Sequence, residues 1–376
     1  MNKHHPNIDK YIRPSSLQAI ALCEGRPTME ANVVALDGEP ESTGVASLGH
    51  ELHGFAEAAV AAVKEGMEWG EAIADVCNHA TEQGVDSWSV YCLQHALEIV
   101  RDLVLKHGIE LHNILTEHHL AMASLGFAQG GTADVILVIP GVLVIVIDYK
   151  FGFIDQGTAD EHDQLQAYAA AAAETFTAPD VIVALIQPRA DKSNRVSLAR
   201  FDADTLRANR TWTAAVIRLA RAPDPQLNAG FTQCQHCRAL HRCPEARRFM
   251  MQTKEALETL GPPMDADTRG ELADAAKLSE KFAEVGKGIA KTALQAGEKV
   301  TGWKLGTPRA MRSVADPRAA IQALAENGIT VEDLTKMEAL TFKVGALTPP
   351  ALELVESFIT EKLSDPPLTQ DKKGRG

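Results

Sequence analysis

The chain has 376 residues, of which 45% are hydrophobic, and a formal net charge of -13 at pH 7. This length allows one large domain or two ordinary ones, and the apolar content suffices for a real core. The acidic balance argues against a broadly basic nucleic-acid binder, although a DNA enzyme can place its cations locally. No apolar run is long enough to span a membrane and no signal region follows the N-terminus, so we expect a cytoplasmic protein without membrane contact.

The hydrophobic pattern predicts helices first and then a mixture of strands and helices. A short helix is expected over residues 15–22, followed by a polar loop, and longer helices over 46–64 and 87–106. The period then changes, and two apolar strands separated by Pro140 and Gly141 predict a tight hairpin. After the hairpin we expect, in order, a helix, two strands and a helix over residues 161–175, 180–187, 195–201 and 203–219.

Past residue 250 the sequence becomes charged and helical in character. Helices are expected over residues 268–296 and 317–327, within a helical C-terminal region that spans 251–363. The final segment, 364–376, contains two prolines and a basic, glycine-containing end, so we expect a disordered tail.

Two aspartates, Asp134 and Asp148, stand at the open end of the predicted hairpin. With the turn centred near Gly141, antiparallel pairing brings them opposite each other or one residue away. Carboxylates so placed repel each other unless a cation lies between them, and Mg²⁺ or Mn²⁺ favours such oxygen ligands. Lys150 leaves the strand on the same face as Asp148, where its ammonium could hold a water or the charge developing on a phosphate. Alternatively, both aspartates end strands in solvent and pair with Lys150.

These residues belong to longer motifs in a specific order. Gly-Thr-Ala-Asp at 131–134, an apolar hairpin and Asp-Tyr-Lys at 148–150 resemble motifs II and III of the PD-(D/E)XK nucleases. Upstream, the spacing of Gly49, His53 and Glu57 resembles the first motif of the RecB-like branch, Gly-xxx-His-xxx-Glu. Downstream, residues 164–168 resemble its Gln-xxx-Tyr motif. The resemblance implies an α/β fold with a restriction-endonuclease-like core, a mixed central sheet flanked by helices, over residues 1–250.

The resemblance also implies roles for the motif residues. The ligands of one or two Mg²⁺ or Mn²⁺ ions would be Asp134, Asp148, His53 and the carbonyl of Tyr149, with Glu57 as a water-mediated partner. Lys150 would assist the attacking water, and Gln164 and Tyr168 would contact the scissile phosphate or orient Lys150. Three of these residues have ordinary alternatives, since His53 could be a polar surface residue and the Gln164–Tyr168 pair could be helix surface. His50 rivals His53, although only His53 has the motif spacing.

The function implied by the resemblance is that of a metal-dependent DNA nuclease. The expected role is an exonuclease that acts on DNA ends in phage recombination or replication, inside the bacterial host cell. Its partners would be DNA and a single-strand annealing or other recombination protein. The alternative is a non-catalytic DNA-end or single-strand binding protein that uses the nuclease fold as a scaffold.

A cysteine cluster follows the predicted core. Cys234, Cys237 and Cys243 have the spacing C-x₂-C-x₅-C, and Cys23 lies far upstream. This order resembles the iron–sulfur subset of RecB-like nucleases, the AddB-type and the four-cysteine CRISPR-adaptation enzymes, and implies a 4Fe–4S cluster that ties the two ends of the domain together. Two alternatives are a zinc site completed by a nearby histidine, His236 or His241, and unligated thiols. The remaining two cysteines, Cys77 and Cys92, lie on predicted helices and are expected to be small apolar residues.

The C-terminal region holds one basic segment with an aromatic residue. Its candidates for DNA contact are Trp303, Lys304, Arg309 and Arg312, through base stacking and phosphate pairing. A solvated loop with a packed Trp303 is the alternative. The layout of the whole chain resembles an uncharacterised family of phage and prophage proteins.

Overall fold

The structure is a computed structural model that describes residues 8–37, 44–190, 195–259, 266–306, 310–314, 317–327, 357, 359–363 and 368–370. The chain divides into two compact units, Met1–Lys281 and Phe282–Gly376. Within the described ranges, no helix combines the length and the apolar character needed to cross a membrane.

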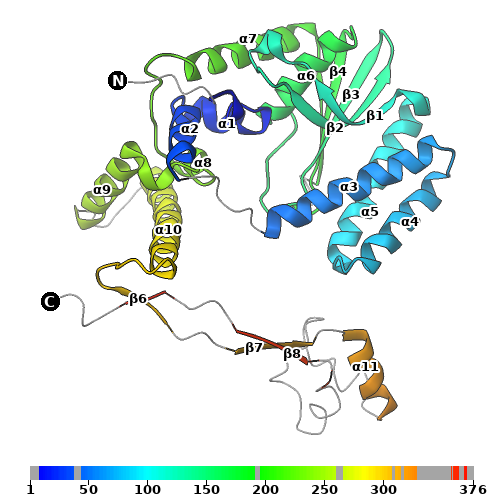
Figure 1. Ribbon diagram of the computed structural model, residues 1–376. Helices are drawn as coiled ribbons and strands as arrows, with labels where there is room; N and C mark the ends of the chain where they lie inside the picture. The colour runs from blue at the N-terminus through cyan, green and yellow to red at the C-terminus, as the bar shows by residue number, and fades with distance from the viewer. Residues whose placement is uncertain are drawn as a thin grey trace. The chain divides into compact units, whose positions relative to one another are not determined.

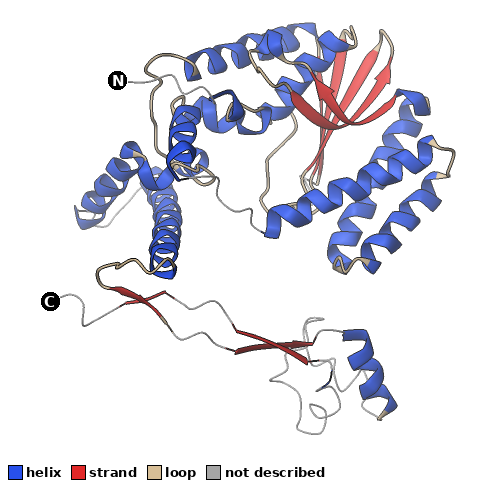
Figure 2. Cartoon of the chain, in the orientation of Figure 1, coloured by secondary structure: helices blue, strands red, loops and turns tan. Residues whose placement is uncertain are grey.

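A five-stranded mixed sheet forms the centre of the first unit (Figures 1 and 2). The strands stand in sequence order across the sheet, and every neighbouring pair is antiparallel except β3 and β4, which are parallel. They are β1 (Ile114–Leu120), β2 (Gly131–Ile139), β3 (Leu143–Tyr149), β4 (Asp180–Ile186) and β5 (Val196–Phe201). This mixed sheet, with helices on both sides, confirms the predicted α/β class.

Helices cover both faces of this sheet (Figure 2). Along β2, Ile136 and Val138 belong to one core cluster with α6 and α7, whereas Val135 and Leu137 belong to a second cluster with α3, α4 and α5. This alternation follows from the two-residue period of a strand, and it explains why β2 and β3 are apolar on both faces. The helices of this unit before the cysteine cluster are α1 (Leu17–Leu22), α2 (Arg26–Asp37), α3 (Gly44–Lys64), α4 (Trp69–Glu82), α5 (Ser87–His107), α6 (Asp163–Thr175) and α7 (Ala203–Ala220).

The hairpin of β2 and β3 forms as the sequence predicts. The Val142 N–H donates to the Ile139 carbonyl at 3.0 Å, and Gly141, with φ at 70°, takes the left-handed position that follows a proline in a tight turn. The register pairs Val135 with Ile147, so the next positions outward are Asp134 and Asp148. The two aspartates therefore stand opposite each other.

Three elements of the first unit differ from the expectation or were not expected. The polar loop predicted after residue 22 is wrong, because α2 begins at Arg26, and Pro27 suits the first turn of a helix, where no backbone donor is lost. Helix α4 and strand β1 were not predicted. In β1 only the two end residues, Ile114 and Leu120, are buried, so its polar middle hides the strand pattern.

The C-terminal region is helical, as predicted, and also contains short strands. Its helices are α9 (Pro244–Thr259), α10 (Ala266–Gln295), which begins in the first unit and ends in the second, and α11 (Pro317–Glu326). Two antiparallel pairs follow, β6 (Trp303–Leu305) with β9 (Leu368–Gln370), and β7 (Ala310–Val314) with β8 (Ile359–Leu363). Strand β9 lies in the segment expected to be a disordered tail; the rest of that segment lies outside the described residues.

Candidate functional site

Three neighbouring strands each place one carboxylate at the same level of the sheet. In β1, Thr116 pairs with Val135 and His118 with Ala133, so Glu117 stands opposite Asp134. The β2–β3 register places Asp134 opposite Asp148. The charges interact, because the carboxylate of Asp134 raises the pKa of both Glu117 and Asp148. The sheet thus lines up three acidic side chains.

Helix α3 adds a histidine to this row. The Nδ1 atom of His53 lies 3.3 Å from Oδ1 of Asp134 and 4.0 Å from Oε1 of Glu117. One ligand atom from each of these three side chains lies within 4.8 Å of the others, a spacing that a single metal ion can bridge. The imidazole is held in place by edge-on contacts with the rings of Tyr149 and Phe151, at centroid distances of 5.8 and 5.4 Å.

The electrostatic potential of the site favours a cation. Burial alone would lower the pKa of His53, but its hydrogen bond to Asp134 and the charges of the three carboxylates raise it. Burial and the neighbouring Asp134 charge raise the pKa of Glu117. A protonated histidine or a bound metal ion would each offset this repulsion, and the carboxylate oxygens suit Mn²⁺ or Mg²⁺.

Asp134 is oriented by the backbone as well as by His53. Its Oδ2 accepts the N–H of Tyr149 at 2.6 Å, which leaves Oδ1 toward His53 and Glu117. The backbone donor and the histidine together hold this side chain in one orientation. The carbonyl of Tyr149, which the resemblance implies as a ligand, stays a prediction.

Asp148, Lys150 and Gln164 form a second group beside the first. Oδ2 of Asp148 lies 2.6 Å from Nζ of Lys150, and the amide of Gln164 bridges the pair, donating to Asp148 at 3.0 Å and accepting from Lys150 at 3.2 Å. Burial raises the pKa of Asp148 to about 6, against the lowering effect of Lys150. Burial would lower the pKa of Lys150, but Asp148 raises it, so the lysine stays protonated. Lys150 is further fixed by its N–H, which donates to the Ile186 carbonyl at 2.8 Å.

Tyr168 supports the strand that carries Asp134. Its hydroxyl donates to the carbonyl of Thr132 at 2.8 Å. A Cβ at Gly131 would stand 2.6 Å from a ring carbon of Tyr168 and 2.8 Å from Cγ of Pro14, so only glycine allows this close approach. Gly131 and Tyr168, which the sequence assigned to two motifs, are therefore two sides of one contact. In this position Tyr168 positions the backbone of β2.

Glu117 is held in a strained backbone conformation. Its φ is 44°, in the left-handed region that residues other than glycine, asparagine and aspartate adopt rarely and at a cost. The residue interrupts a regular antiparallel pairing between Thr116 and His118. Strain of this kind is frequently concentrated at functional positions, where the surrounding structure holds it. Here it accompanies the carboxylate that completes the three-residue group.

The sequence-predicted residues fall into three sets. His53 and Asp134 come together in the three-residue group, and Asp148 and Lys150 lie beside it with Gln164. Glu57 is exposed one turn along α3 and lies outside the group, although its charge contributes to the raised pKa of Glu117. Sequence reasoning missed Glu117 because β1 was not predicted. The register of β1 against β2 is the signal that reveals it.

The four predicted cysteines come together at the C-terminal end of α1. Cys23 directly follows α1, Cys234 ends α8 (Phe231–Cys234), and Cys243 directly precedes α9. Electrostatic interactions link Cys23 with Cys234 and Cys243, and Cys234 with Cys237. The Sγ of Cys23 accepts the N–H of Asn228 at 3.4 Å, and the Asn228 amide donates to the carbonyl of Leu22 at 2.9 Å. These bonds join the N-terminal segment to the stretch of chain that leads into the triplet.

The sulfur atoms of this cysteine cluster are not tightly packed. Across the described part of the chain, the group of His53, Glu117 and Asp134 is the one set of three histidine, cysteine or acidic side chains whose ligand atoms lie within 4.8 Å. Burial raises the pKa of Cys23 and Cys234, and raises that of Cys237 to about 12. These thiols therefore need a positive centre to ionise. Of the other two cysteines, Cys92 is buried and Cys77 half-buried.

The C-terminal candidates lie in the second unit. Trp303 and Lys304 are in β6, with Trp303 half-buried and Lys304 exposed. Arg312 is in β7, where its backbone pairs with Glu361, and Arg309 lies outside the described residues. Their contact with DNA stays a prediction.

Comparison with known proteins identifies the family of this chain. A family model described as a protein of unknown function, DUF2800, matches residues 19–363. The chain belongs to the DUF2800 family. No curated protein matches it. Among solved structures, the crystal structure of SSO0001 is similar at 22% identity over 46% of this chain and 80% of that chain, with a TM-score of 0.22, from which we draw no conclusion.

The backbone strain at Glu117 predicts an inverted order of stability for two small replacements. At an ordinary strand position glycine is less stable than alanine by roughly 0.5–1 kcal/mol. At a left-handed position the order reverses, because alanine keeps the clash of its Cβ, by about 1 kcal/mol. We therefore expect Glu117→Gly to exceed Glu117→Ala in free energy of unfolding, measured with urea. The same pair at the neighbouring Thr116 is the control and should show the ordinary order; an ordinary order at both positions would contradict the strain.

Proposed function

We propose that this DUF2800 protein is a metal-dependent DNA nuclease of the RecB-like, PD-(D/E)XK type. The observation that carries the proposal is the meeting of His53, Glu117 and Asp134 beside the Asp148–Lys150 pair, at the open end of one hairpin. Four motifs far apart in the sequence supply His53, Asp134, the Asp148–Lys150 pair and their supports, and β1 adds Glu117. Their order and spacing resemble that nuclease branch, and the mixed sheet is compatible with its restriction-endonuclease-like core.

The site residues fit one or two Mg²⁺ or Mn²⁺ ions. His53, Glu117 and Asp134 would hold one ion, and Asp148, next to Asp134, would share in binding it or a second. A divalent cation bound there would neutralise phosphate charge and make a water molecule more acidic. Hydrolysis of a phosphodiester adds the water oxygen to phosphorus and breaks one P–O bond, so that one product carries a phosphate monoester and the other a hydroxyl.

Within this reaction, Lys150 acts as a cation and hydrogen-bond donor. Its raised pKa keeps it protonated, so it is suited to hold the negative charge that develops on the phosphate oxygens and unsuited to accept a proton. Gln164 is a positioning residue, since its amide oxygen accepts from Nζ of Lys150 and its amide nitrogen donates to Asp148. Tyr168 positions β2. Removing either residue should loosen the site without removing a reacting group.

We propose that the four cysteines hold a 4Fe–4S cluster. Support for this proposal comes from the order of Cys23, Cys234, Cys237 and Cys243, which resembles the iron–sulfur subset of RecB-like nucleases. A zinc site completed by His236 or His241 is the alternative. The cluster would tie α1 to the segment before α9.

The proposed biological role is that of an exonuclease on DNA ends in phage recombination or replication. DNA is the proposed substrate, and a single-strand annealing or other recombination protein the proposed partner. This role rests on the resemblance of the motifs alone. The alternative is a non-catalytic DNA-binding protein with the same fold, which would bind DNA in the degradation assay without shortening it.

Replacing site residues should abolish Mn²⁺-dependent degradation of end-labelled linear DNA. For Asp134→Asn and Lys150→Gln we expect the rate to fall by at least about a hundredfold, because the first removes a charged ligand of the metal ion and the second removes the cation at the reacting phosphate. Lys106→Gln, on the exposed side of α5, is the matched control and should retain the rate. Circular dichroism establishes that each variant is folded.

Two outcomes would contradict the nuclease proposal. Unchanged cleavage by both site variants would place the chemistry elsewhere. DNA binding by the native protein without any shortening of single- or double-stranded substrates, in Mn²⁺ or Mg²⁺, would favour the non-catalytic rival.

The cofactor proposal has its own optical test. Protein purified without oxygen should be brown, with visible absorption that fades on reduction. Cys234→Ser should lose this absorption, whereas Cys77→Ser, on α4, should keep it. A colourless native protein with one zinc ion per chain would overturn the iron–sulfur assignment.

A further inference from the structure

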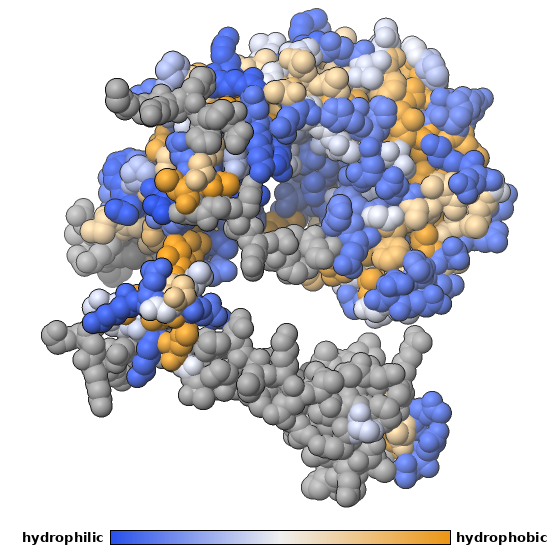
Figure 3. Space-filling view, in the orientation of Figure 1, coloured by the Kyte–Doolittle hydropathy of each residue, from blue (hydrophilic) through white to orange (hydrophobic). Residues whose placement is uncertain are grey.

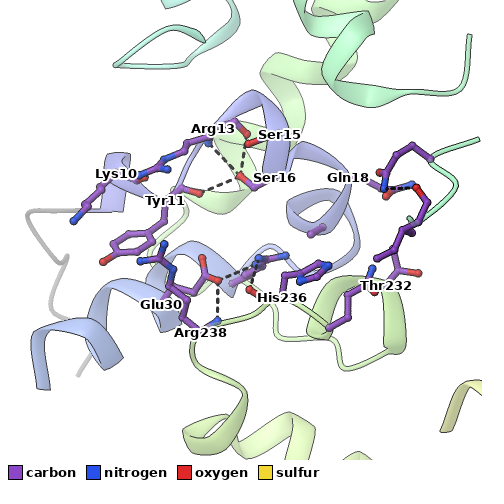
Figure 4. Close-up of a pocket in the computed structure, with 15 residues that line it drawn as sticks. Lys10, Tyr11, Arg13, Ser15, Ser16, Gln18, Glu30, Thr232, His236 and Arg238 are labelled. Carbon is purple, nitrogen blue, oxygen red and sulfur yellow. Dashed lines mark hydrogen bonds and ion pairs between the residues drawn. The ribbon is translucent and has the colours of Figure 1, made fainter. Parts of the chain in front are cut away.

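A basic cavity lies between the N-terminal segment and the loop that carries the cysteine triplet. Its volume is about 300 Å³, and Figure 4 shows side chains from both segments around it. From the N-terminal side come residues of the turns before α1, of α1 and of α2. From the other side come residues between 232 and 238, and Ile154 and Gln156 of the loop after β3 complete the wall. The basic, acidic and histidine residues of its wall are Lys10, Arg13, Arg26, Glu30, His236 and Arg238.

The wall of this cavity is positive although the protein as a whole is acidic. Four basic side chains face one carboxylate, that of Glu30, which is buried and already accepts from Nε of Arg26 at 3.2 Å and from the N–H of Arg238 at 3.1 Å. Burial, then Arg26, then Lys281 lower the pKa of His236, so the local field opposes any further cation. An anion is the ligand that such a cavity favours.

The arginines of the cavity have different tasks. Arg26 is structural, since Nη1 donates to the carbonyl of Gln233 at 3.3 Å and Nη2 to that of His236 at 3.1 Å. Arg13 is exposed, and its Nε donates a hydrogen bond to the Lys10 carbonyl at 2.7 Å. Within the described chain, its two terminal amino groups therefore remain for a ligand. Arg238 is exposed, with its guanidinium 6.0 Å from the ring centroid of Tyr11. A guanidinium fork suits phosphate oxygens.

The basic cavity adjoins the candidate active site. A second cavity of about 200 Å³ is lined by Lys150 and Gln164, and the two cavities share Ser15, Gln18 and Gln156. Figure 3 shows the first unit hollowed between its α1 side and its α3 side, with mostly hydrophilic side chains around the hollow. Two acidic residues, Glu161 and Asp163, line the second cavity, so the positive charge is concentrated in the first.

We infer that the cavity of Arg13 and Arg238 binds a backbone phosphate of the DNA strand whose scissile bond lies at Lys150. The inference rests on the proposed nuclease function and extends it to a separate phosphate subsite. Because the two cavities share part of their walls, one strand can occupy both. The subsite holds the strand through its phosphates without reading base sequence, and its wall includes the loop between Cys234 and Cys237, so the cysteine cluster would support it.

The test measures binding without requiring hydrolysis. A fluorescein-labelled oligothymidylate of twenty nucleotides is titrated with the full-length protein in EDTA, and its anisotropy is followed at several KCl concentrations. For Arg13→Gln combined with Arg238→Gln we expect affinity to fall about tenfold and the slope of log K against log[KCl] to become shallower by about 0.7, the contribution of the one phosphate that the two arginines neutralise on a single strand. The paired Arg→Lys replacements, which keep both charges, should retain most of the slope.

Arg218→Gln, on α7 and in the wall of neither cavity, is the matched control and should leave affinity and slope unchanged. An unaltered slope in the paired Arg→Gln variant with an unaltered melting temperature would overturn the subsite, as would an equal loss in the Arg218 control. Competition by poly-glutamate as strong as that by unlabelled oligothymidylate would also overturn it, in favour of an acidic protein partner. If the native protein binds the strand with the expected slope but never cleaves it, the nuclease proposal fails while the phosphate subsite stands.

Discussion

The repulsion among Glu117, Asp134 and Asp148 is the constraint on which the rest of the candidate site depends. The registers of β1, β2 and β3 set one carboxylate from each strand opposite the next. Such a row is unfavourable unless positive charge lies close by. Two neighbouring side chains can supply positive charge. His53 contacts Asp134 and Glu117, and Lys150 pairs with Asp148. A divalent cation would satisfy the remaining charge, which is why a metal-dependent function is the one we propose.

The fold supplies this arrangement from elements that are far apart in the sequence. A tight turn at Gly141 sets the register of the two central strands, and helix α3 packs its buried face on one side of the sheet while presenting His53 at the strand ends. On the other side α6 lies close, because its alanines are buried against the sheet, and it brings Gln164 to the Asp148–Lys150 pair. The site is therefore a consequence of packing on both faces of one hairpin.

Much of this architecture could be predicted from the sequence, and the reasons for the failures are physical. The hairpin was predictable because its strands are continuous apolar runs and its turn has the Pro-Gly signal. Strand β1 was not predictable, because only its ends are buried and its middle is polar. Glu117 was missed for the same reason, and no local sequence pattern indicates its positive φ. Helix α2 was hidden by a proline that suits a first turn. The spacing places Lys150 beside Asp148, but the hydrogen bond from Gln164 to Asp148 and the exposure of Glu57 follow from tertiary contacts that spacing alone does not contain.

The central claim is that His53, Glu117 and Asp134 hold a divalent cation, and anomalous diffraction tests it most directly. Crystals of the full-length protein soaked in Mn²⁺ should show an anomalous peak within bonding distance of all three side chains, close to the carboxylate of Asp148. The same experiment on Glu117→Gln should show that peak weakened or absent. A native crystal saturated with Mn²⁺ that lacks a peak at these residues, or that shows it only at other acidic side chains, would contradict the account.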